Sequence, residues 1–163
     1  MTALGAVDVT ALDHIYVTVR DLRRAEAFYD PVMRLFGFRK GTLGIGGDPH
    51  VHYFNRVTQY SLRPARDAAR HDPYRVGLHH LCFRVATPAD VDTAARGLAE
   101  LGIVASEPRL YPEYAADYYA TFFTDPDGIR LELVAHRRLR SLVVEHWAAL
   151  TEFEDPLRKA GLL

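Results

Sequence analysis

The sequence predicts an α+β protein built from two tandem copies of one β-α-β-β-β module and a C-terminal helix. Three observations support this. The strand-like run 12–19 resembles the run 78–85, which follows it 66 residues later. Each run precedes a segment with apolar residues at helical spacing, and each such segment precedes three strand-like runs separated by turns. We therefore expect modules over 11–64 and 76–136 that form one domain, with a helical extension over 137–163.

The two predicted helices have start and stop signals of their own. Asp21 can cap the first helix, which should end at Gly37. Pro31 lies inside this helix and lacks a backbone N–H, so we expect a kink or a break there. Thr87 can cap the second helix, with a proline at the first helical position, and Gly102 should end it.

Strand-like runs follow each helix. A DPDG sequence at 125–128 has the composition of a tight hairpin turn, so it should separate the last two strands. The predicted strands of the first module are 39–43, 51–55 and 58–63, and those of the second are 104–109, 118–124 and 129–135.

The composition narrows the class of protein. The 163 residues are 48% hydrophobic and 25% charged with a formal net charge of -1, which is ordinary for a globular chain and does not favour nucleic-acid binding. No apolar run approaches the roughly 18 residues that span a bilayer. The first residues lack the pattern of a signal peptide, and Cys82 is the single cysteine. We expect a cytoplasmic protein without a membrane or nucleic-acid partner.

Strand alternation places several polar side chains on one face of the predicted sheet. His14 and Tyr16 share that face in the first strand, His80 occupies it in the matching strand, and Arg130 and Glu132 occupy it in the last. Two interpretations are open. The face is either the solvated side of a half-buried antiparallel sheet or the lining of a cavity into which imidazole and carboxylate groups converge.

Three segments carry a family resemblance: LDHIYVTVRDLRRAEAFY, GLHHLCFRV and YYATFFTDPDGIRLELV. In this order they resemble the vicinal oxygen chelate superfamily, which includes glyoxalases, extradiol dioxygenases, fosfomycin-resistance transferases and bleomycin-resistance proteins. The resemblance spans about residues 11–136. It implies a cupped, mostly antiparallel sheet around a metal cavity, with His14, His80 and Glu132 as ligands of one divalent cation.

The fourth ligand position of the resembled fold departs from the glyoxalase pattern. Aligning the strand of Gln59 with the strand of Arg130 puts Ser61 opposite Glu132. A serine hydroxyl is too weak a base to abstract a carbon-bound proton near neutral pH. Two histidines and one carboxylate with open positions suit Fe2+, and Mn2+, Ni2+ or Zn2+ would also bind.

Other residues are candidates for contact with substrate. His79 should lie on the opposite face from His80 and serve a structural role. Either Tyr118 or Tyr119 should face Glu132, and plain aromatic packing is the alternative role for both. The predicted catalytic residues are Glu132, Tyr16, Tyr118 and Tyr119, and the predicted substrate-binding residues are Arg130, His50, His52 and Ser61. Arg130 either pairs with an anionic substrate or is solvated at the strand end. His50 and His52 either line the cavity or are ordinary residues at a loop edge.

These expectations define one leading function and one alternative. The first is a metal-dependent enzyme in which the cation chelates adjacent oxygens of a small substrate, with lyase or isomerase chemistry of the glyoxalase type or extradiol dioxygenase chemistry. The alternative is a metal-free binding protein of the bleomycin-resistance type. We also expect a homodimer. The extension over 137–163 should form an amphipathic helix that packs on its own domain or on a second subunit.

Overall fold

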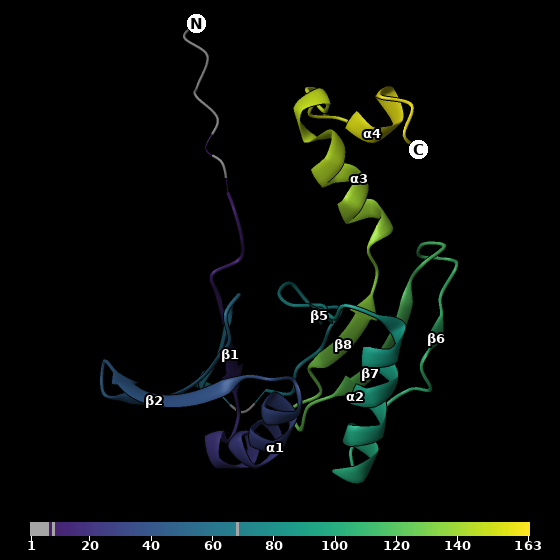
Figure 1. Ribbon diagram of the computed structural model, residues 1–163. Helices are drawn as coiled ribbons and strands as arrows, with labels where there is room; N and C mark the ends of the chain where they lie inside the picture. The colour runs from purple at the N-terminus through teal and green to yellow at the C-terminus, as the bar shows by residue number, and fades with distance from the viewer. Residues whose placement is uncertain (1–6, 8, 68) are drawn as a thin grey trace, which may run out of the picture. The chain divides into compact units, whose positions relative to one another are not determined.

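The structure is a computed structural model that describes residues 7, 9–67 and 69–163 (Figure 1). The chain divides into two compact units. The first extends to His71 and includes the turn Asp125–Gly128, and the second consists of Asp72–Thr124 and Ile129–Leu163.

The first unit contains one four-stranded sheet and one long helix. The strands are ordered β1-β4-β3-β2, with β1 and β4 parallel and the other pairs antiparallel. Its elements are β1 (His14–Val19), α1 (Leu22–Leu35), β2 (Arg39–Ile45), β3 (Asp48–Phe54) and β4 (Gln59–Pro64).

The second unit repeats this topology, with the order β5-β8-β7-β6 and a parallel β5–β8 pair. Its elements are β5 (Leu81–Arg84), α2 (Pro88–Glu100), β6 (Arg109–Leu110), β7 (Tyr119–Thr124) and β8 (Arg130–Ala135), and the C-terminal part adds α3 (Arg138–His146), η1 (Trp147–Ala149) and α4 (Pro156–Lys159). The predicted α+β architecture of two βαβββ modules with a C-terminal helix is confirmed.

The helix caps follow the sequence signals. The Asp21 carboxylate accepts a hydrogen bond from the backbone N–H of Arg24, and Thr87 forms a reciprocal capping box with Asp90. Of the kink or break expected at Pro31, the break does not occur, because α1 continues to Leu35. Fully buried side chains on both sides of the proline, including Tyr29 and Val32, anchor the helix across the missing hydrogen bond.

The predicted strand 104–109 is mostly irregular. Only Arg109 and Leu110 form β6, and Ala105 makes an isolated bridge to Phe123. Pro108 has no N–H to donate to a ladder, and the Ser106 hydroxyl accepts the backbone N–H of Phe122 in place of a strand partner. The segment still contacts β7, because the Ser106 backbone N–H donates to the Phe122 carbonyl at 2.8 Å and the Thr121 hydroxyl donates to the Ser106 carbonyl at 2.7 Å.

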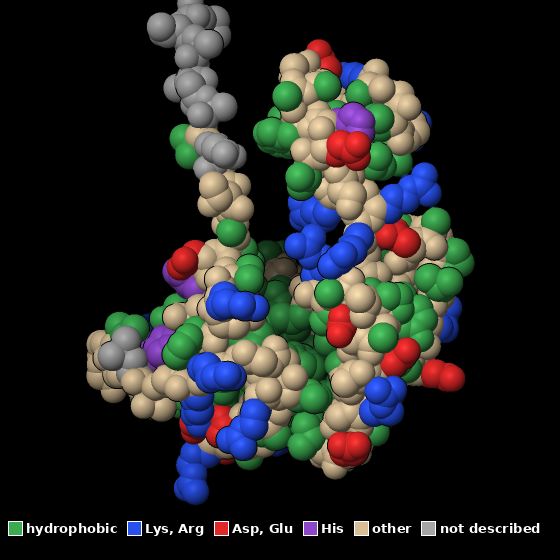
Figure 2. Space-filling view, in the orientation of Figure 1, with side chains coloured by type: hydrophobic (Ala, Val, Ile, Leu, Met, Phe, Trp, Pro, Cys, Tyr) green, Lys and Arg blue, Asp and Glu red, His purple; other side chains and the backbone are tan. Residues whose placement is uncertain are grey.

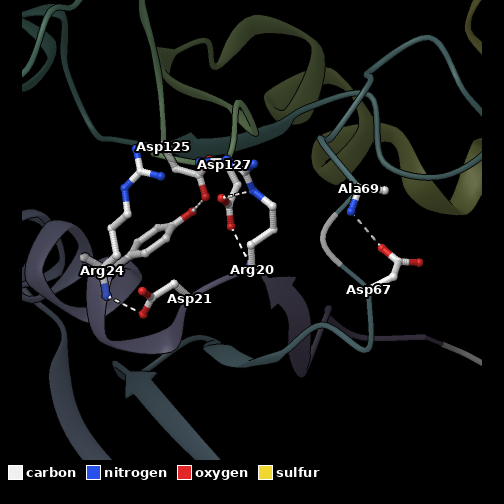
Figure 3. A network of polar contacts seen from close by, with 8 residues as sticks. Arg20, Asp21, Arg24, Asp67, Ala69, Asp125 and Asp127 are labelled. Atoms are coloured by element: carbon white, nitrogen blue, oxygen red, sulfur yellow. Dashed lines mark hydrogen bonds and ion pairs between the residues drawn. The ribbon is translucent and has the colours of Figure 1, made fainter.

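The turn Asp125–Gly128 packs with the first unit although it joins β7 to β8. The Arg20 backbone N–H and its Nε both donate to the Asp127 carboxylate at 2.8 Å (Figure 3). The Tyr29 hydroxyl lies 2.9 Å from the Tyr60 hydroxyl and donates to Asp125 at 3.0 Å. Burial, together with Tyr60 and Asp125, raises the pKa of Tyr29, so this hydroxyl stays protonated as a donor.

The C-terminal part begins at a fixed point of the second unit. The Asp117 carboxylate accepts the backbone N–H groups of Arg137 and Arg138, at 3.0 and 2.8 Å, and pairs with His136 Nδ1 at 2.8 Å. Although its partial desolvation raises the pKa of Asp117, these hydrogen bonds lower it to about 2. Beyond this point α3 contains no buried residue.

Basic side chains gather at the base of the C-terminal helix (Figure 2). Arg84, Arg137 and Arg140 line a hollow of about 670 Å³ there. No helix in the described part of the chain has the length and apolar character needed to cross a membrane.

Candidate metal and substrate site

The strand registers place Ser61 and Glu132 at equivalent positions of the two modules. Tyr16 of β1 pairs with Ser61 of β4, and Cys82 of β5 pairs with Glu132 of β8. Tyr16 and Cys82 are 66 residues apart, the same offset that relates His14 to His80. The equivalence inferred from the sequence therefore agrees with the hydrogen-bonded register.

Glu132 is the best-defined site residue of the second unit. Its side chain is 2% exposed, although it is a carboxylate. The Tyr118 hydroxyl donates to Oε1 at 2.5 Å, and His80 Nε2 lies 3.5 Å from Oε2. A buried carboxylate is stable only when its oxygens have partners, and here each oxygen faces a different one. One oxygen is oriented by a tyrosine, while the other faces an imidazole.

The structure distinguishes the two adjacent tyrosines. Desolvation and the hydrogen bond to Glu132 raise the pKa of Tyr118, so its proton is firmly held. Tyr119 is directed elsewhere, because its hydroxyl donates to Asp92 of α2 at 2.8 Å. That hydrogen bond to Asp92 also raises the pKa of Tyr119. The structure brings Tyr118 to Glu132 and does not bring Tyr119 there.

His79 does not face away from His80 as the strand alternation predicted. The two rings are in contact, with centroids 5.0 Å apart and the Nδ1 atoms 2.8 Å apart. Both residues precede β5, so the alternation of an extended strand does not apply to them. Arg130 Nη1 lies 3.4 Å from His79 Nε2. Because a guanidinium only donates, His79 Nε2 accepts, and His79 Nδ1–H donates to His80.

These groups border a cavity of about 820 Å³ within the second unit. A cavity of this size lies in the range of small-molecule sites, about 300–1,000 Å³. Its polar lining includes His80, Arg130 and Glu132, and much of the remaining lining is apolar or aromatic, including Tyr114 and Phe122. The arrangement suits an organic ligand with a small number of polar atoms.

The His80–Glu132 pair fits two ligands of one metal ion. Two atoms bound at about 2.1 Å to a tetrahedral cation lie about 3.4 Å apart. The separation of 3.5 Å between His80 Nε2 and Glu132 Oε2 matches that value. Among residues 7, 9–67 and 69–163, however, no group of three His, Cys, Asp or Glu side chains is placed to hold a metal ion. His14, the third predicted ligand, belongs to the first unit and stays a prediction.

The first unit holds the other predicted residues in one ring cluster. The Tyr16 ring contacts the rings of His14, His50 and His52 at centroid distances of 5.5, 5.8 and 5.9 Å. His14 is half exposed, and its Nδ1 lies 2.8 Å from the Asp13 carboxylate. Side chains of β1 and β3 therefore meet around Tyr16 within this unit.

His52 and Ser61 form a buried pair in this cluster. His52 Nδ1 lies 2.8 Å from the Ser61 hydroxyl, and Gln59 Nε2 donates to that hydroxyl at 2.9 Å. Desolvation and the neighbouring His50 lower the pKa of His52, so its imidazole is neutral near pH 7. His52 Nε2 is buried without a hydrogen-bond partner among the described residues. Ser61 thus places a neutral hydroxyl beside His52, whereas Glu132 places a carboxylate beside His80.

Several site residues were not identified from the sequence. Gln59 was used only for alignment, no motif marked His79, Tyr114 or Phe122 as cavity residues, and none marked Tyr74 as a neighbour of Arg130. The aromatic-rich segment 111–118 was the available signal, since aromatic side chains in a loop commonly form ligand walls.

Comparisons with known proteins agree with this arrangement. The sequence profile of the Glyoxalase/Bleomycin resistance protein/Dioxygenase superfamily matches residues 11–133. The uncharacterized protein YqjT of Bacillus subtilis (strain 168) is 30% identical over 128 residues, covering 76% of this chain and 98% of YqjT.

Solved structures share the fold. A glyoxylase/bleomycin resistance protein/dioxygenase domain from Frankia sp. EAN1pec has a TM-score of 0.67 at 23% identity, covering 80% of this chain and 100% of that chain. FosX from Listeria monocytogenes, a fosfomycin resistance protein in complex with Mn(II) and 1S,2S-dihydroxypropylphosphonic acid, has a TM-score of 0.62 at 18% identity, with coverages of 83% and 98%. The profile match over most of the chain, the relative and the shared fold agree: the protein belongs to the Glyoxalase/Bleomycin resistance protein/Dioxygenase superfamily.

Proposed function

We propose that this protein is an enzyme that binds one divalent cation, Fe2+, Mn2+, Ni2+ or Zn2+, through His80, Glu132 and His14, and acts on a small molecule with two adjacent oxygens. The observation that carries the proposal is the buried Glu132 carboxylate, with one oxygen facing His80 at 3.5 Å beside an 820 Å³ cavity. A carboxylate kept out of water beside an imidazole is costly unless a cation or a proton compensates its charge.

The protein side chains have separable roles in this site. A bound cation would supply Lewis acidity to the two substrate oxygens. Tyr118 orients Glu132 through its hydrogen bond to Oε1, which leaves Oε2 toward His80. The apolar and aromatic walls can contact an apolar part of the substrate, and Arg130 can orient a charged substituent. In the first unit, we propose that Tyr16, His50, His52 and Ser61 contact the substrate. FosX, which shares the fold, has Mn(II) and a dihydroxy compound in its crystal structure, and this supports the choice of ligand chemistry.

Metal analysis of the purified full-length protein tests the proposal. We expect one divalent ion per chain, and we expect His80→Ala to lower metal affinity at least tenfold. The matched control is His146→Ala, since that histidine lies in α3 and, within the described part of the chain, hydrogen-bonds the Leu142 carbonyl alone. If the wild-type protein binds none of the four metals and His80→Ala leaves small-molecule binding unchanged, the metal-free binding protein is the correct function.

Oxygen uptake then separates the reaction types. Oxygen consumption with catechols in the Fe2+-loaded protein would identify an extradiol dioxygenase. Tight Ni2+ or Zn2+ binding without oxygen consumption would identify lyase or isomerase chemistry of the glyoxalase type. Loss of either activity in His80→Ala, but not in His146→Ala, would assign it to this site.

We further propose that the protein works in the cytoplasm as a homodimer. The C-terminal part supports the dimer, because Val144, Trp147 and Phe153 are 77, 65 and 99% exposed. Light scattering of the full chain and of Trp147→Ser tests this. A dimer that the substitution weakens is the expected result, and a wild-type monomer at micromolar concentration would contradict it.

A further inference from the structure

We infer that the substrate of this site is an organic anion with an aromatic or bulky apolar body, and that Arg130 recognises its negative charge. The inference rests on the proposed function, because it takes the cavity beside His80 and Glu132 as the substrate site. It adds the chemical class of the part of the substrate that does not bind the metal.

The Arg130 guanidinium lies at the cavity among groups that are not anions. Arg130 lines the cavity, where the lining contains one arginine and no lysine. Its Cζ lies 5.0 Å from the centroid of the Tyr74 ring, and its Nη1 contacts the Tyr74 hydroxyl at 3.3 Å and His79 Nε2 at 3.4 Å. Neither neighbour is an anion, so these contacts hold the side chain in place without supplying an opposite charge.

Part of the Arg130 guanidinium remains available to donate hydrogen bonds to a ligand. Among the described residues, no carboxylate forms an ion pair with Arg130, and its Nε and Nη2 have no hydrogen-bond partner. Glu132 lies two residues away on β8, but Tyr118 and His80 face its oxygens. A guanidinium with free N–H groups binds a carboxylate or a phosphonate through paired hydrogen bonds.

Apolar and aromatic side chains form a wall of the cavity. The Tyr114 ring packs edge-on against the Tyr118 ring, with the ring centroids 5.3 Å apart, and Phe122 also lines the cavity. Tyr114 and Val104 are 65 and 90% exposed although both border the cavity. A ligand body that covers these surfaces would gain burial energy in proportion to the apolar area removed from water. The Arg130 guanidinium and the apolar lining together suit a ligand that has one negative group and an apolar body.

Two naphthalene probes of similar shape test the inference: 2-naphthylacetate, which is an anion, and 2-naphthylacetamide, which is neutral. Their fluorescence on titration with the full-length protein gives both affinities. EDTA-treated protein is used so that a metal cannot bind the carboxylate. We expect the wild-type protein to bind the anion about tenfold more tightly than the amide, as a charge-assisted pair predicts.

Three variants separate charge from shape. Arg130→Gln should remove the preference for the anion and leave the affinity for the amide unchanged. Tyr114→Ala should weaken both probes to a similar extent. Arg96→Gln, which removes an exposed arginine on α2, should change neither affinity.

The inference is overturned if neither probe binds, if the wild-type protein binds both equally, or if Arg130→Gln weakens both equally. It is also overturned if Arg96→Gln has the effect expected of Arg130→Gln, since the preference would then come from net charge. Its failure is distinguishable from that of the proposed function. The probe preference is measured without metal, whereas the proposed function depends on metal binding and its loss in His80→Ala.

Discussion

The two modules have the same strand order and the same parallel pairing, yet their equivalent sheet positions carry different chemistry. In the first module, Ser61 is fully buried and hydrogen-bonded to His52 and Gln59. In the second, Glu132 is almost as buried but faces His80, with Tyr118 on its other oxygen. A neutral hydroxyl is satisfied by neutral partners, whereas a carboxylate at this depth needs a compensating charge. The two equivalent positions therefore differ in role: a neutral hydrogen-bonded hydroxyl in the first module and a buried carboxylate beside a histidine in the second.

Removing the polar group from each equivalent position in turn tests whether the two modules differ in metal binding. Glu132→Gln should lower the affinity for a divalent cation about a hundredfold, because an amide is a weak ligand without charge. Ser61→Ala should change it less than about threefold, since the hydroxyl supports His52 and is not a predicted ligand. Competition with a chromophoric chelator measures both. Equal losses in the two variants would contradict the division of roles.

The two units also differ in their buried hydrogen bonds, and the first unit has the larger buried hydrogen-bond network. Tyr29→Phe removes the hydroxyl that bonds Tyr60 and Asp125, and should lower the free energy of unfolding by about 2 kcal/mol. Tyr53→Phe is the control, because Tyr53 donates to Asp30, which keeps Lys40 as a partner. It should cost about 0.5 kcal/mol. Urea denaturation gives both values, and equal losses would show that Asp125 does not tie its turn to the first unit.

The smallest expected effect is a pH dependence in the second unit. The pKa of Asp117 is lowered to about 2 in the folded protein, below its usual value near 4. Its contribution to stability is therefore present above about pH 4 and is lost as the pH falls toward 2. Because the side chain is 36% exposed, we reduce the contribution to about 1 kcal/mol.

Asp117→Asn should accordingly be less stable than the wild-type protein by about 1 kcal/mol at pH 7, and the difference should shrink between pH 4 and pH 2. Urea denaturation at several pH values measures it. Asp72→Asn is a suitable control, because the contacts of Asp72 with described residues are local: an ion pair with Arg75 and a hydrogen bond from the Tyr74 backbone N–H. A difference between wild type and Asp117→Asn that stays constant down to pH 2 would contradict the assigned cause.

Much of the fold was predictable because its signals are local. Asp21 and Thr87 cap helices through atoms three residues away, so the sequence pattern alone identifies them. Of the kink or break expected at Pro31, the break does not occur, since the burial of Tyr29 and Val32 against other elements outweighs one missing hydrogen bond. Local propensity predicts an element well only where distant packing does not oppose it.

The candidate site was predictable only in part, because strand alternation applies within a strand and not to the residues before it. Strand alternation identified the face shared by Arg130 and Glu132, because successive side chains in an extended strand must alternate. It misplaced His79, which precedes the strand, and it left Tyr118 and Tyr119 undecided. The hydroxyl contacts decide between the tyrosines: one reaches Glu132 of β8 and the other Asp92 of α2.

By itself the sequence determined the duplicated β-α-β-β-β architecture, the helix caps and the position of Glu132 opposite Ser61, because these depend on spacing and on residue type. Three contacts were decided only by the tertiary structure. Asp125 and Asp127 accept hydrogen bonds from Tyr29 and Arg20 of the first unit. Tyr74 and His79 contact Arg130, and His52 Nδ1 lies within hydrogen-bond distance of the Ser61 hydroxyl. Each of these pairs joins different elements or loops. Its energy depends on burial and on distances that chain spacing does not encode.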